Sequence, residues 1–293
     1  MVRDPARDER MSAAKITGAV RLYAIIGDPI AQVRSPETIS AGFAAKGMNA
    51  ICIPAHVPAD RFDVIAPALM ALGNLDGVLV TVPFKARMIA FADRLGEAAK
   101  TIGAVNALRR EADGSWSGDM FDGMGFVRGV ERKGEKVRGR RVALFGAGGA
   151  GSAIGYALAA SGAQSIDIID PDAGRAAALV DKLKIAVPRC PVAAATALPR
   201  SVDMIVNASP VGMRADDGMP DDVPELDAGT LVGDVVITAQ PTALIRHAVA
   251  CGCRWVDGRD MHAGQVDAIV NFFAATSPSR NDQGISGHGS RTR

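Results

Sequence analysis

Lys85 stands at the end of an apolar segment, where a basic side chain could take part in chemistry. The segment "VTVPFK" covers residues 80–85. Pro83 cannot donate to a strand ladder, so the predicted strand ends there and Lys85 follows at the C-terminal edge, where α/β sheets bind ligands. A desolvated lysine at that edge can serve as an acid or a base. By spacing alone an ordinary solvated lysine fits as well, so other residues must distinguish a catalytic lysine from a solvated one.

Residues 118–123 form a second stretch that could carry chemistry, because two acids surround two bulky apolar residues. The stretch reads "GDMFDG", with a glycine at each end. Asp and Gly are common in surface turns, whereas acids beside apolar residues also suit an active site. The pattern alone leaves both interpretations open.

A glycine-rich turn, "FGAGGAG" at residues 145–151, follows a predicted strand and opens a predicted helix. Glycine lets the backbone approach a pyrophosphate, and the helix N-terminus offers unpaired N–H groups and a positive dipole end. The turn therefore predicts a dinucleotide site at Gly146, Gly148, Gly149, Ala150 and Gly151. The alternative is a tight helix-packing turn without a ligand.

Asp170 ends the next predicted strand, nineteen residues after Gly151, where an acid can bind both hydroxyls of an adenosine ribose. Asp172 adds a second carboxylate, and a 2′-phosphate would be repelled by the pair. Arg175 is the one nearby cation that could oppose this argument, and by default it is a charge on the helix surface. We therefore expect NAD to be preferred over NADP.

The elements that must position these residues alternate between β-branched runs and Ala-rich helical segments. Examples of the runs are "LYAIIG", "AICIPAHV", "GVLVTVP", "VALFG" and "SIDIID". This alternation predicts an α/β fold whose strands flanking helices are parallel. A charged segment, residues 131–141, precedes the strand before the glycine-rich turn, so a second domain is predicted to begin there.

The length and composition of the whole chain limit the number of domains, the kinds of partner and the kinds of site. Its 293 residues favour two domains, and 33 basic against 32 acidic residues give no surplus of charge for nucleic acid. No apolar run reaches the length of a membrane span and no signal-peptide core opens the chain, which favours a cytoplasmic protein. The four cysteines and four histidines show no metal-ligand spacing, so reduced structural cysteines and no metal site are expected.

Seven segments occur in an order and spacing that resembles the shikimate/quinate dehydrogenase family. They are "GDPIAQVRSP", "VTVPFK", "IGAVNAL", "GDMFDGMGF", "FGAGGAG", "NASPVGM" and "DGRDMHAGQ", within residues 21–275. The resemblance implies an N-terminal α/β substrate-binding domain, a C-terminal Rossmann NAD(P)-binding domain and a cleft between them. The expected division is a flexible tail at 1–20, a substrate domain at 21–124, a Rossmann domain at 125–256, a helix at 257–276 that returns to the substrate domain, and a flexible tail at 277–293.

The resemblance also assigns roles to single residues. Lys85 matches the catalytic lysine and Asp122 its aspartate partner. The substrate-binding polar residues match Ser35, Thr81, Asn106 and Gln265. The loop that runs beside the nicotinamide in the family matches Asn207, Ala208, Ser209, Val211 and Met213.

The substrate side departs from the family pattern. Val33 replaces one serine of the Ser-x-Ser pair that holds the substrate carboxylate, and Leu79 and Phe121 replace an asparagine and a threonine. Ile237 stands where a tyrosine is usual. Two lost hydrogen bonds to a carboxylate remove about 3 to 6 kcal/mol, a hundredfold or more in affinity, unless Arg34 or His262 substitutes.

Together these features predict an NAD-dependent oxidoreductase that transfers a hydride reversibly between a ring CH–OH and the nicotinamide. The substrate is expected to be a cyclic hydroxy acid or related alcohol. An authentic shikimate or quinate dehydrogenase, and an NAD-binding regulator without activity, are the alternatives. The expected partner is a small-molecule substrate, with no nucleic acid or membrane, and the chain is a monomer or a homodimer.

Overall fold

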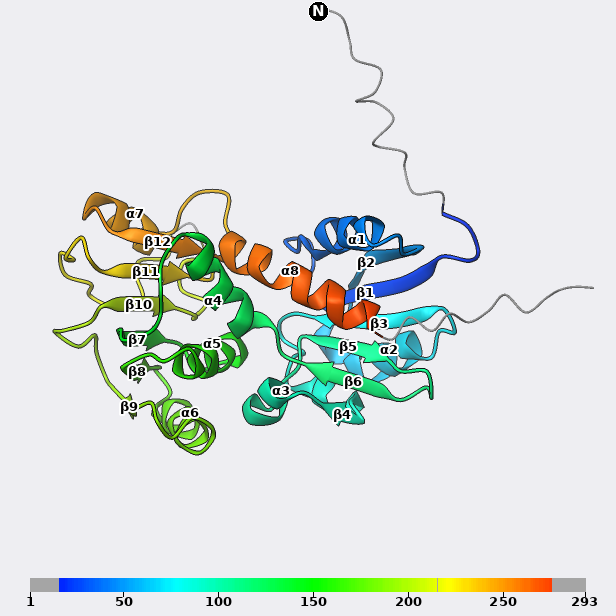
Figure 1. The fold of residues 1–293 in the computed structure, drawn as a ribbon, viewed down its shortest axis with the longest axis horizontal. Coiled ribbons are helices and arrows are strands. Elements are labelled where there is room, and N and C mark those ends of the chain that lie inside the picture. Colours follow the sequence, from blue (N-terminus) through cyan, green and yellow to red (C-terminus); the bar gives the residue numbers. More distant parts are fainter. Residues whose placement is uncertain (1–15, 215, 276–293) are drawn as a thin grey trace, which may run out of the picture.

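The computed structural model describes residues 16–214 and 216–275, and these form two lobes that lie side by side (Figure 1). Each lobe is built on a six-stranded sheet. The predicted tail at 277–293 and most of the one at 1–20 lie outside the described residues. The α/β fold predicted from the sequence is confirmed.

The first lobe contains a mixed sheet in the order β2-β1-β3-β5-β6-β4. Its strands are β1 (Arg21–Gly27), β2 (Ala50–His56), β3 (Leu75–Val80), β4 (Arg94–Leu95), β5 (Ala107–Arg110) and β6 (Trp116–Asp119). Its helices are α1 (Ser35–Ala45), α2 (Phe62–Met70) and α3 (Glu97–Ile102), with 3-10 turns η3 (Ala59–Arg61) and η4 (Arg87–Phe91). The strands β1, β2 and β3 are parallel, whereas β5 is antiparallel to both β3 and β6.

The second lobe contains an all-parallel sheet in the order β12-β11-β10-β7-β8-β9. Its strands are β7 (Arg141–Phe145), β8 (Ser165–Ile169), β9 (Val192–Ala194), β10 (Met204–Asn207), β11 (Leu231–Asp234) and β12 (Arg254–Asp257). Its helices are α5 (Gly149–Ala160), α6 (Ala173–Ala186) and α7 (Ala243–Ala250). The order reverses at β7, and ligands of open parallel sheets bind at the carboxyl ends of the strands beside such a reversal.

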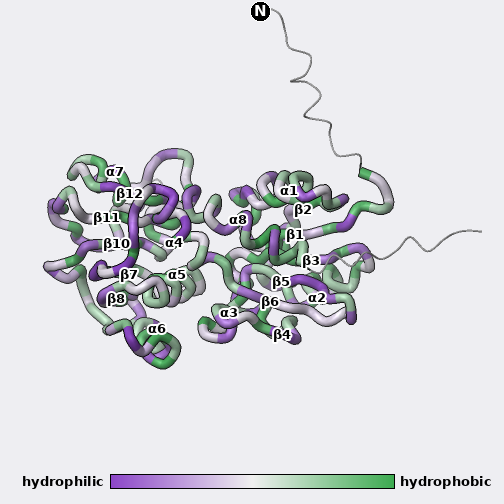
Figure 2. Tube along the Cα trace, in the orientation of Figure 1, coloured by the Kyte–Doolittle hydropathy of each residue, from purple (hydrophilic) through white to green (hydrophobic). Residues whose placement is uncertain are grey.

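Two helices, α4 (Asp122–Arg132) and α8 (Gly258–Ala274), join the lobes. The helix α8 starts beside the second sheet and runs across to the first, where it packs on α1 (Figure 1). The charged segment 131–141 leads from α4 to β7 and is strongly hydrophilic along most of its length (Figure 2). The sequence places that segment at the start of the second predicted domain, and the second sheet does begin at its end.

Glycines allow α4 and α8 to cross closely. A side chain at Gly264 would overlap the carbonyl oxygen of Gly125, and one at Gly125 would come within 2.7 Å of the Met261 carbonyl oxygen. On the other side of α4, a side chain at Gly123 would overlap the Ala153 carbonyl of α5. The approach of the two connecting helices therefore depends on the absence of side chains at these positions.

The structure differs from the sequence-based expectations in the extent of single strands. The strand predicted to run through Thr81 ends at Val80, and the one predicted to include Ile237 ends at Asp234. The hairpin of β5 and β6 was not expected, because its strands have four residues each. Within residues 16–214 and 216–275, no helix is long and apolar enough to cross a membrane.

We expect the change Gly264→Ala to lower the free energy of unfolding by about 2 kcal/mol, since overpacking at a closed contact costs about 1–3 kcal/mol. Gly73→Ala is the matched control, because a side chain there meets nothing within 4 Å. Thermal and urea denaturation of both variants measure the difference. Equal stabilities of the two variants would contradict the close crossing of α4 and α8.

Candidate active site

Four polar residues from separate elements meet where the two lobes join. Lys85 follows β3, Asn106 immediately precedes β5, Asp122 opens α4 and Gln265 lies on α8. Backbone hydrogen bonds hold the first two in place: Val105 N donates to the Lys85 carbonyl at 3.0 Å, and Asn106 N donates to the Asp119 carbonyl at 3.0 Å. The residues come together because β3, β5 and β6 are neighbours in the sheet and present these ends at one edge.

Asp122 is the centre of this group. Lys85 Nζ donates to Asp122 Oδ2, and Asn106 Nδ2 donates to Asp122 Oδ1 at 2.8 Å. Asn106 Nδ2 also donates to Gln265 Oε1 at 3.3 Å. The side chains of Lys85 and Asp122 are 16% and 4% exposed, so the ion pair is largely withdrawn from water.

The orientation of the Asn106 amide is determined by the backbone. Its Oδ1 accepts from Phe121 N at 2.9 Å, which leaves its NH2 group facing Asp122 and Gln265. A carboxylate held between an ammonium and an amide can keep a nearby hydroxyl oriented, while the lysine can exchange a proton with it. The group is therefore chemically suited to moving a proton on and off an alcohol.

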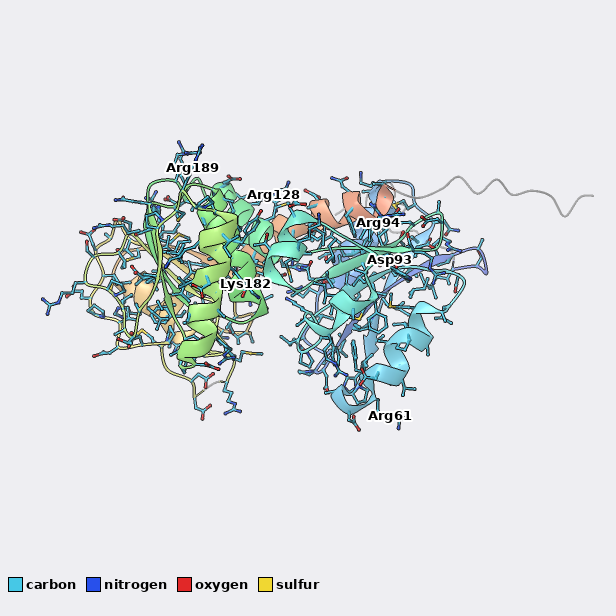
Figure 3. The ribbon with its side chains drawn as sticks, turned by 90° about the horizontal axis from the view of Figure 1, so that it is seen from below. Arg61, Asp93, Arg94, Arg128, Lys182 and Arg189 are labelled. Atoms are coloured by element: carbon cyan, nitrogen blue, oxygen red, sulfur yellow. The ribbon has the colours of Figure 1, made fainter. Side chains whose placement is uncertain are left out.

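Lys85 also lies against the glycine-rich turn of the other lobe. A side chain at Gly149 would stand 3.8 Å from Lys85 Cδ. A second contact spans the lobes at α6, where Lys182 points toward α3 (Figure 3) and its Nζ donates to the Ile102 carbonyl at 3.1 Å. The lysine beside Asp122 and the predicted dinucleotide turn are thus immediate neighbours.

The glycine-rich turn has the shape that a dinucleotide requires. Gly146 has φ +96°, and a side chain there would meet the backbone of Ala208 at 2.9 Å. A side chain at Gly151 would overlap the Gly146 carbonyl, whereas one at Gly148 would meet nothing within 4 Å. The turn is therefore closed toward the sheet and open at Gly148, and the first N–H groups of α5, at residues 149–151, are available to phosphate oxygens. These features fit a pyrophosphate.

Asp170 follows β8 and is tied to the same turn. Its Oδ2 accepts from Ala147 N at 2.8 Å, and its Oδ1 accepts from Asp172 N at 2.9 Å. Arg175 pairs with Asp170 Oδ1 at 3.1 Å and with Asp172 Oδ2 at 3.3 Å. Arg175 is therefore more than a surface charge, because it neutralises part of the acidic pair at the predicted ribose site.

The loop after β10 lies on the other side of the turn. Asn207 is fully buried and holds the loop through Ser209 and Val211: its Nδ2 donates to the Val211 carbonyl at 2.9 Å, and its Oδ1 accepts from Ser209 Oγ at 2.6 Å. A side chain at Gly151 would contact Ala208 Cβ at 3.6 Å. Met213 is 53% exposed at the end of this loop.

Three of the residues that depart from the family pattern share one apolar cluster. Leu79 and Phe121 are buried in it, and Val33 packs against it. The Phe121 ring lies 5.3 Å from the ring of Phe272 on α8, measured between centroids. The polar groups that the family pattern predicts at these three positions are thus replaced by one apolar cluster close to Asp122. We call Val33, Leu79 and Phe121 the apolar wall.

The remaining predicted substrate residues are more dispersed. The Thr81 methyl lies against Gly27, where a side chain would overlap it, and Ser35 is the first residue of α1. Ile237 lies against Gly258 at the start of α8 and is 39% exposed. The structure does not bring Ile237 into contact with the Lys85 group among the described residues.

His262 and Arg34 flank the first turn of α1. His262 Nε2 lies 2.9 Å from Thr38 Oγ1, a contact for which the sequence offers no signal because Thr38 is an ordinary helical residue. Burial and the charge of Arg34 lower the pKa of His262, while Asp122 acts in the opposite direction. The lowered pKa favours the neutral imidazole near pH 7.

Comparison with known proteins agrees with this geometry. The model for the shikimate dehydrogenase substrate binding domain matches residues 25–108. A shikimate dehydrogenase (NADP(+)) of Rubrobacter xylanophilus is 37% identical over 255 residues, covering 86% of this chain and 89% of the relative. The chain belongs to the shikimate/quinate dehydrogenase family. It is accordingly an oxidoreductase that acts on CH–OH groups.

Solved structures of similar proteins show the same fold, one with NAD bound and one free of ligand. Quinate dehydrogenase from Corynebacterium glutamicum in complex with NAD is similar to this chain with TM-score 0.79 and 31% identity, covering 87% of this chain and 94% of that one. The ligand-free 5-ketofructose reductase of Gluconobacter sp. strain CHM43 has TM-score 0.78 and 26% identity, with 88% and 94% covered. Among residues 16–214 and 216–275, no group of His, Cys, Asp and Glu could hold a metal ion.

Proposed function

We propose that the protein is an NAD-dependent dehydrogenase that interconverts a ring CH–OH and the corresponding ketone, with Lys85 and Asp122 as its catalytic pair. The observation that carries the proposal is the Lys85–Asp122–Asn106 group, which lies beside the glycine-rich turn of the second lobe. The family membership supports the reaction class.

The roles of the residues follow from their contacts. Asp122 accepts the substrate hydroxyl hydrogen bond and keeps Lys85 oriented, because its two oxygens already face Lys85 and Asn106. Lys85 takes up the hydroxyl proton during oxidation and returns it during reduction. Asn106 and Gln265, which contact each other, bind the other ring hydroxyls. Burial of the group keeps water away from the proton transfer.

The dinucleotide, when bound, supplies the hydride acceptor or donor. The turn at residues 146–151 would hold its pyrophosphate and the loop at residues 207–213 its nicotinamide end. Asp170 would bind the adenosine ribose hydroxyls, which favours NAD. The similar quinate dehydrogenase of Corynebacterium glutamicum was solved in complex with NAD. Arg175 limits this preference, because it offsets one of the two carboxylates.

The substrate is proposed to differ from shikimate in the group opposite the reacting carbon. The apolar wall of Val33, Leu79 and Phe121 offers no donor to a carboxylate. The similar 5-ketofructose reductase shows that a protein of this fold can act on a ketose without a carboxylate. A cyclic alcohol, or a hydroxy acid whose acid group lies toward Arg34 and His262, fits the described side chains.

Authentic shikimate or quinate dehydrogenase is the second candidate. It is favoured by the relatives, which carry those names at 32–37% identity. It requires Ser35 together with Arg34 or His262 to bind the substrate carboxylate in place of the lost serine. A regulator that binds the dinucleotide without turnover is opposed by the complete Lys85–Asp122 pair.

Lys85→Ala is expected to reduce turnover by at least about 100-fold, since a positioned acid or base contributes about 10²–10⁴. Dinucleotide binding, measured by calorimetry, should change little, because the groups proposed to bind the phosphates are backbone N–H groups of α5, which the substitution leaves in place. Lys46→Ala, which removes an exposed lysine of the same lobe, is the control. Full activity in Lys85→Ala would refute the catalytic assignment.

A screen of ring alcohols with NAD and NADP tests the substrate. We expect shikimate to be at least about 100-fold poorer in kcat/KM than the best alcohol found, since two hydrogen bonds to a charged group are missing. Val33→Ser should then raise kcat/KM for shikimate about tenfold, with Val33→Ala as the control that adds no hydroxyl. Efficient shikimate turnover by the unaltered protein would instead establish the second candidate.

Asp170→Ala is expected to raise the ratio of kcat/KM with NADP to that with NAD by about tenfold or more, because Arg175 is then free of its shorter ion pair. Asp181→Ala, which removes an exposed acid on α6, should leave the ratio unchanged. The ratio is measured from initial rates with each dinucleotide at several concentrations. An unaltered protein that already prefers NADP would overturn the proposed preference.

A further inference from the structure

Asp234 is a buried acid that none of the roles above uses. It is the last residue of β11 and is only 1% exposed. In the parallel sheet it pairs with Asn207, the last residue of β10. It therefore lies at the carboxyl edge of the second sheet, directly beside the strand that leads into the loop 207–213.

The Asp234 carboxylate binds three different segments. Its Oδ2 accepts from Thr242 Oγ1 at 2.7 Å. Its Oδ1 accepts from Asn207 Nδ2 at 3.1 Å and from Val236 N at 3.1 Å. These partners are a hydroxyl, an amide and a backbone N–H. Burial raises the pKa of Asp234, while the hydrogen bonds from these partners act against that rise. A carboxylate is costly to bury in this way, and its retention calls for a role.

Asn207 transmits this contact to the loop. With its NH2 group held by Asp234, the amide oxygen of Asn207 is turned toward Ser209, where it accepts from both N at 3.1 Å and Oγ at 2.6 Å. Ser209 Oγ in turn accepts from Val211 N at 3.2 Å, and Asn207 Nδ2 donates to the Val211 carbonyl. A rotated Asn207 amide would break these contacts together, because donor and acceptor would exchange places.

Thr242 supports the far end of the same loop. It caps α7 by accepting from Ile245 N at 3.3 Å. Gly212 has φ +100°, and a side chain there would stand 3.2 Å from Thr242 Cγ2. Asp234 thus binds Asn207 at the start of the loop and Thr242, which lies beside Gly212 at its end.

We propose that Asp234 is a positioning residue, whose buried carboxylate holds the loop 207–213 in the conformation that receives the nicotinamide end of the dinucleotide. This inference rests on the proposed function, since it concerns the same cofactor site. It goes beyond that function by placing the control of nicotinamide orientation in a carboxylate that does not touch the cofactor. The adenosine end, bound through the glycine-rich turn and Asp170, does not depend on it.

The test compares two ligands by calorimetry: NAD, and ADP-ribose, which lacks the nicotinamide. Asp234→Ala is expected to weaken NAD binding about tenfold while ADP-ribose binding changes by less than about twofold, because the lost hydrogen bonds to a charged acceptor act on the loop alone. With the best alcohol from the screen, kcat should fall about tenfold or more with an unchanged KM for the alcohol. Asp203→Ala, which removes an acid immediately before β10 that pairs with Arg141, is the control for both ligands.

Asp234→Asn keeps the size of the side chain and can still accept from Asn207, so it carries the test if Asp234→Ala does not fold. It should weaken NAD binding about threefold at unchanged ADP-ribose affinity. Equal losses for both ligands, or unchanged NAD binding and kcat in a folded variant, would overturn the inference while leaving the proposed function intact. Failure of the unaltered protein to bind NAD or NADP would overturn both.

Discussion

The buried carboxylate of Asp122 is the constraint on which the rest of the structure depends. An ionised carboxylate that is 4% exposed is stable only when its oxygens are hydrogen-bonded and its charge is paired. Lys85 and Asn106 meet these needs, and they come from two strand ends that are far from Asp122 in the sequence. The mixed sheet of the first lobe therefore serves to bring three short segments to one point.

The same constraint explains the close packing around α4. Asp122 begins this helix, which also carries the glycines that let α5 and α8 approach it. The close crossing brings Gln265 of α8 to Asn106, and it brings the glycine-rich turn that opens α5 to Lys85. One helix thus connects the Lys85–Asp122–Asn106 group to both Gln265 and the proposed cofactor site.

The two sides of the site differ in how they hold polar groups. The cofactor side is rich in hydrogen bonds, with Asp170 and Asp234 each accepting from several donors. The proposed substrate side beyond Asn106 carries Val33, Leu79 and Phe121, which share one apolar cluster. Under the proposed function, chemistry and cofactor binding can be preserved while substrate recognition changes, because the groups proposed to contact the reacting atoms and those proposed to contact the far end of the substrate lie on different elements.

The sequence predicts Lys85, Asp122 and the glycine-rich turn as site residues, because short motifs with strict chemistry remain visible in a linear chain. The structure brings the three together. The sequence could not reveal Thr38 as the partner of His262, because a helical threonine has no distinguishing neighbours in the sequence. Nor does the sequence show that Asp234 is buried, since a strand ending in an acid looks the same whether that acid is solvated or buried. Arg175 was visible as a charge, but its pairing with both Asp170 and Asp172 depends on how α6 lies beside the end of β8.

The sequence by itself determined the α/β class, the family and the residue types available for hydride and proton transfer, because these depend on periodicity and on motifs within short segments. The tertiary structure decided which side chains touch. It grouped Lys85, Asn106, Asp122 and Gln265, gathered Val33, Leu79 and Phe121 into one apolar cluster, and buried Asp234 beside the start of the loop 207–213. Such contacts join residues tens to more than a hundred positions apart, and only the packing of strands and helices sets those distances.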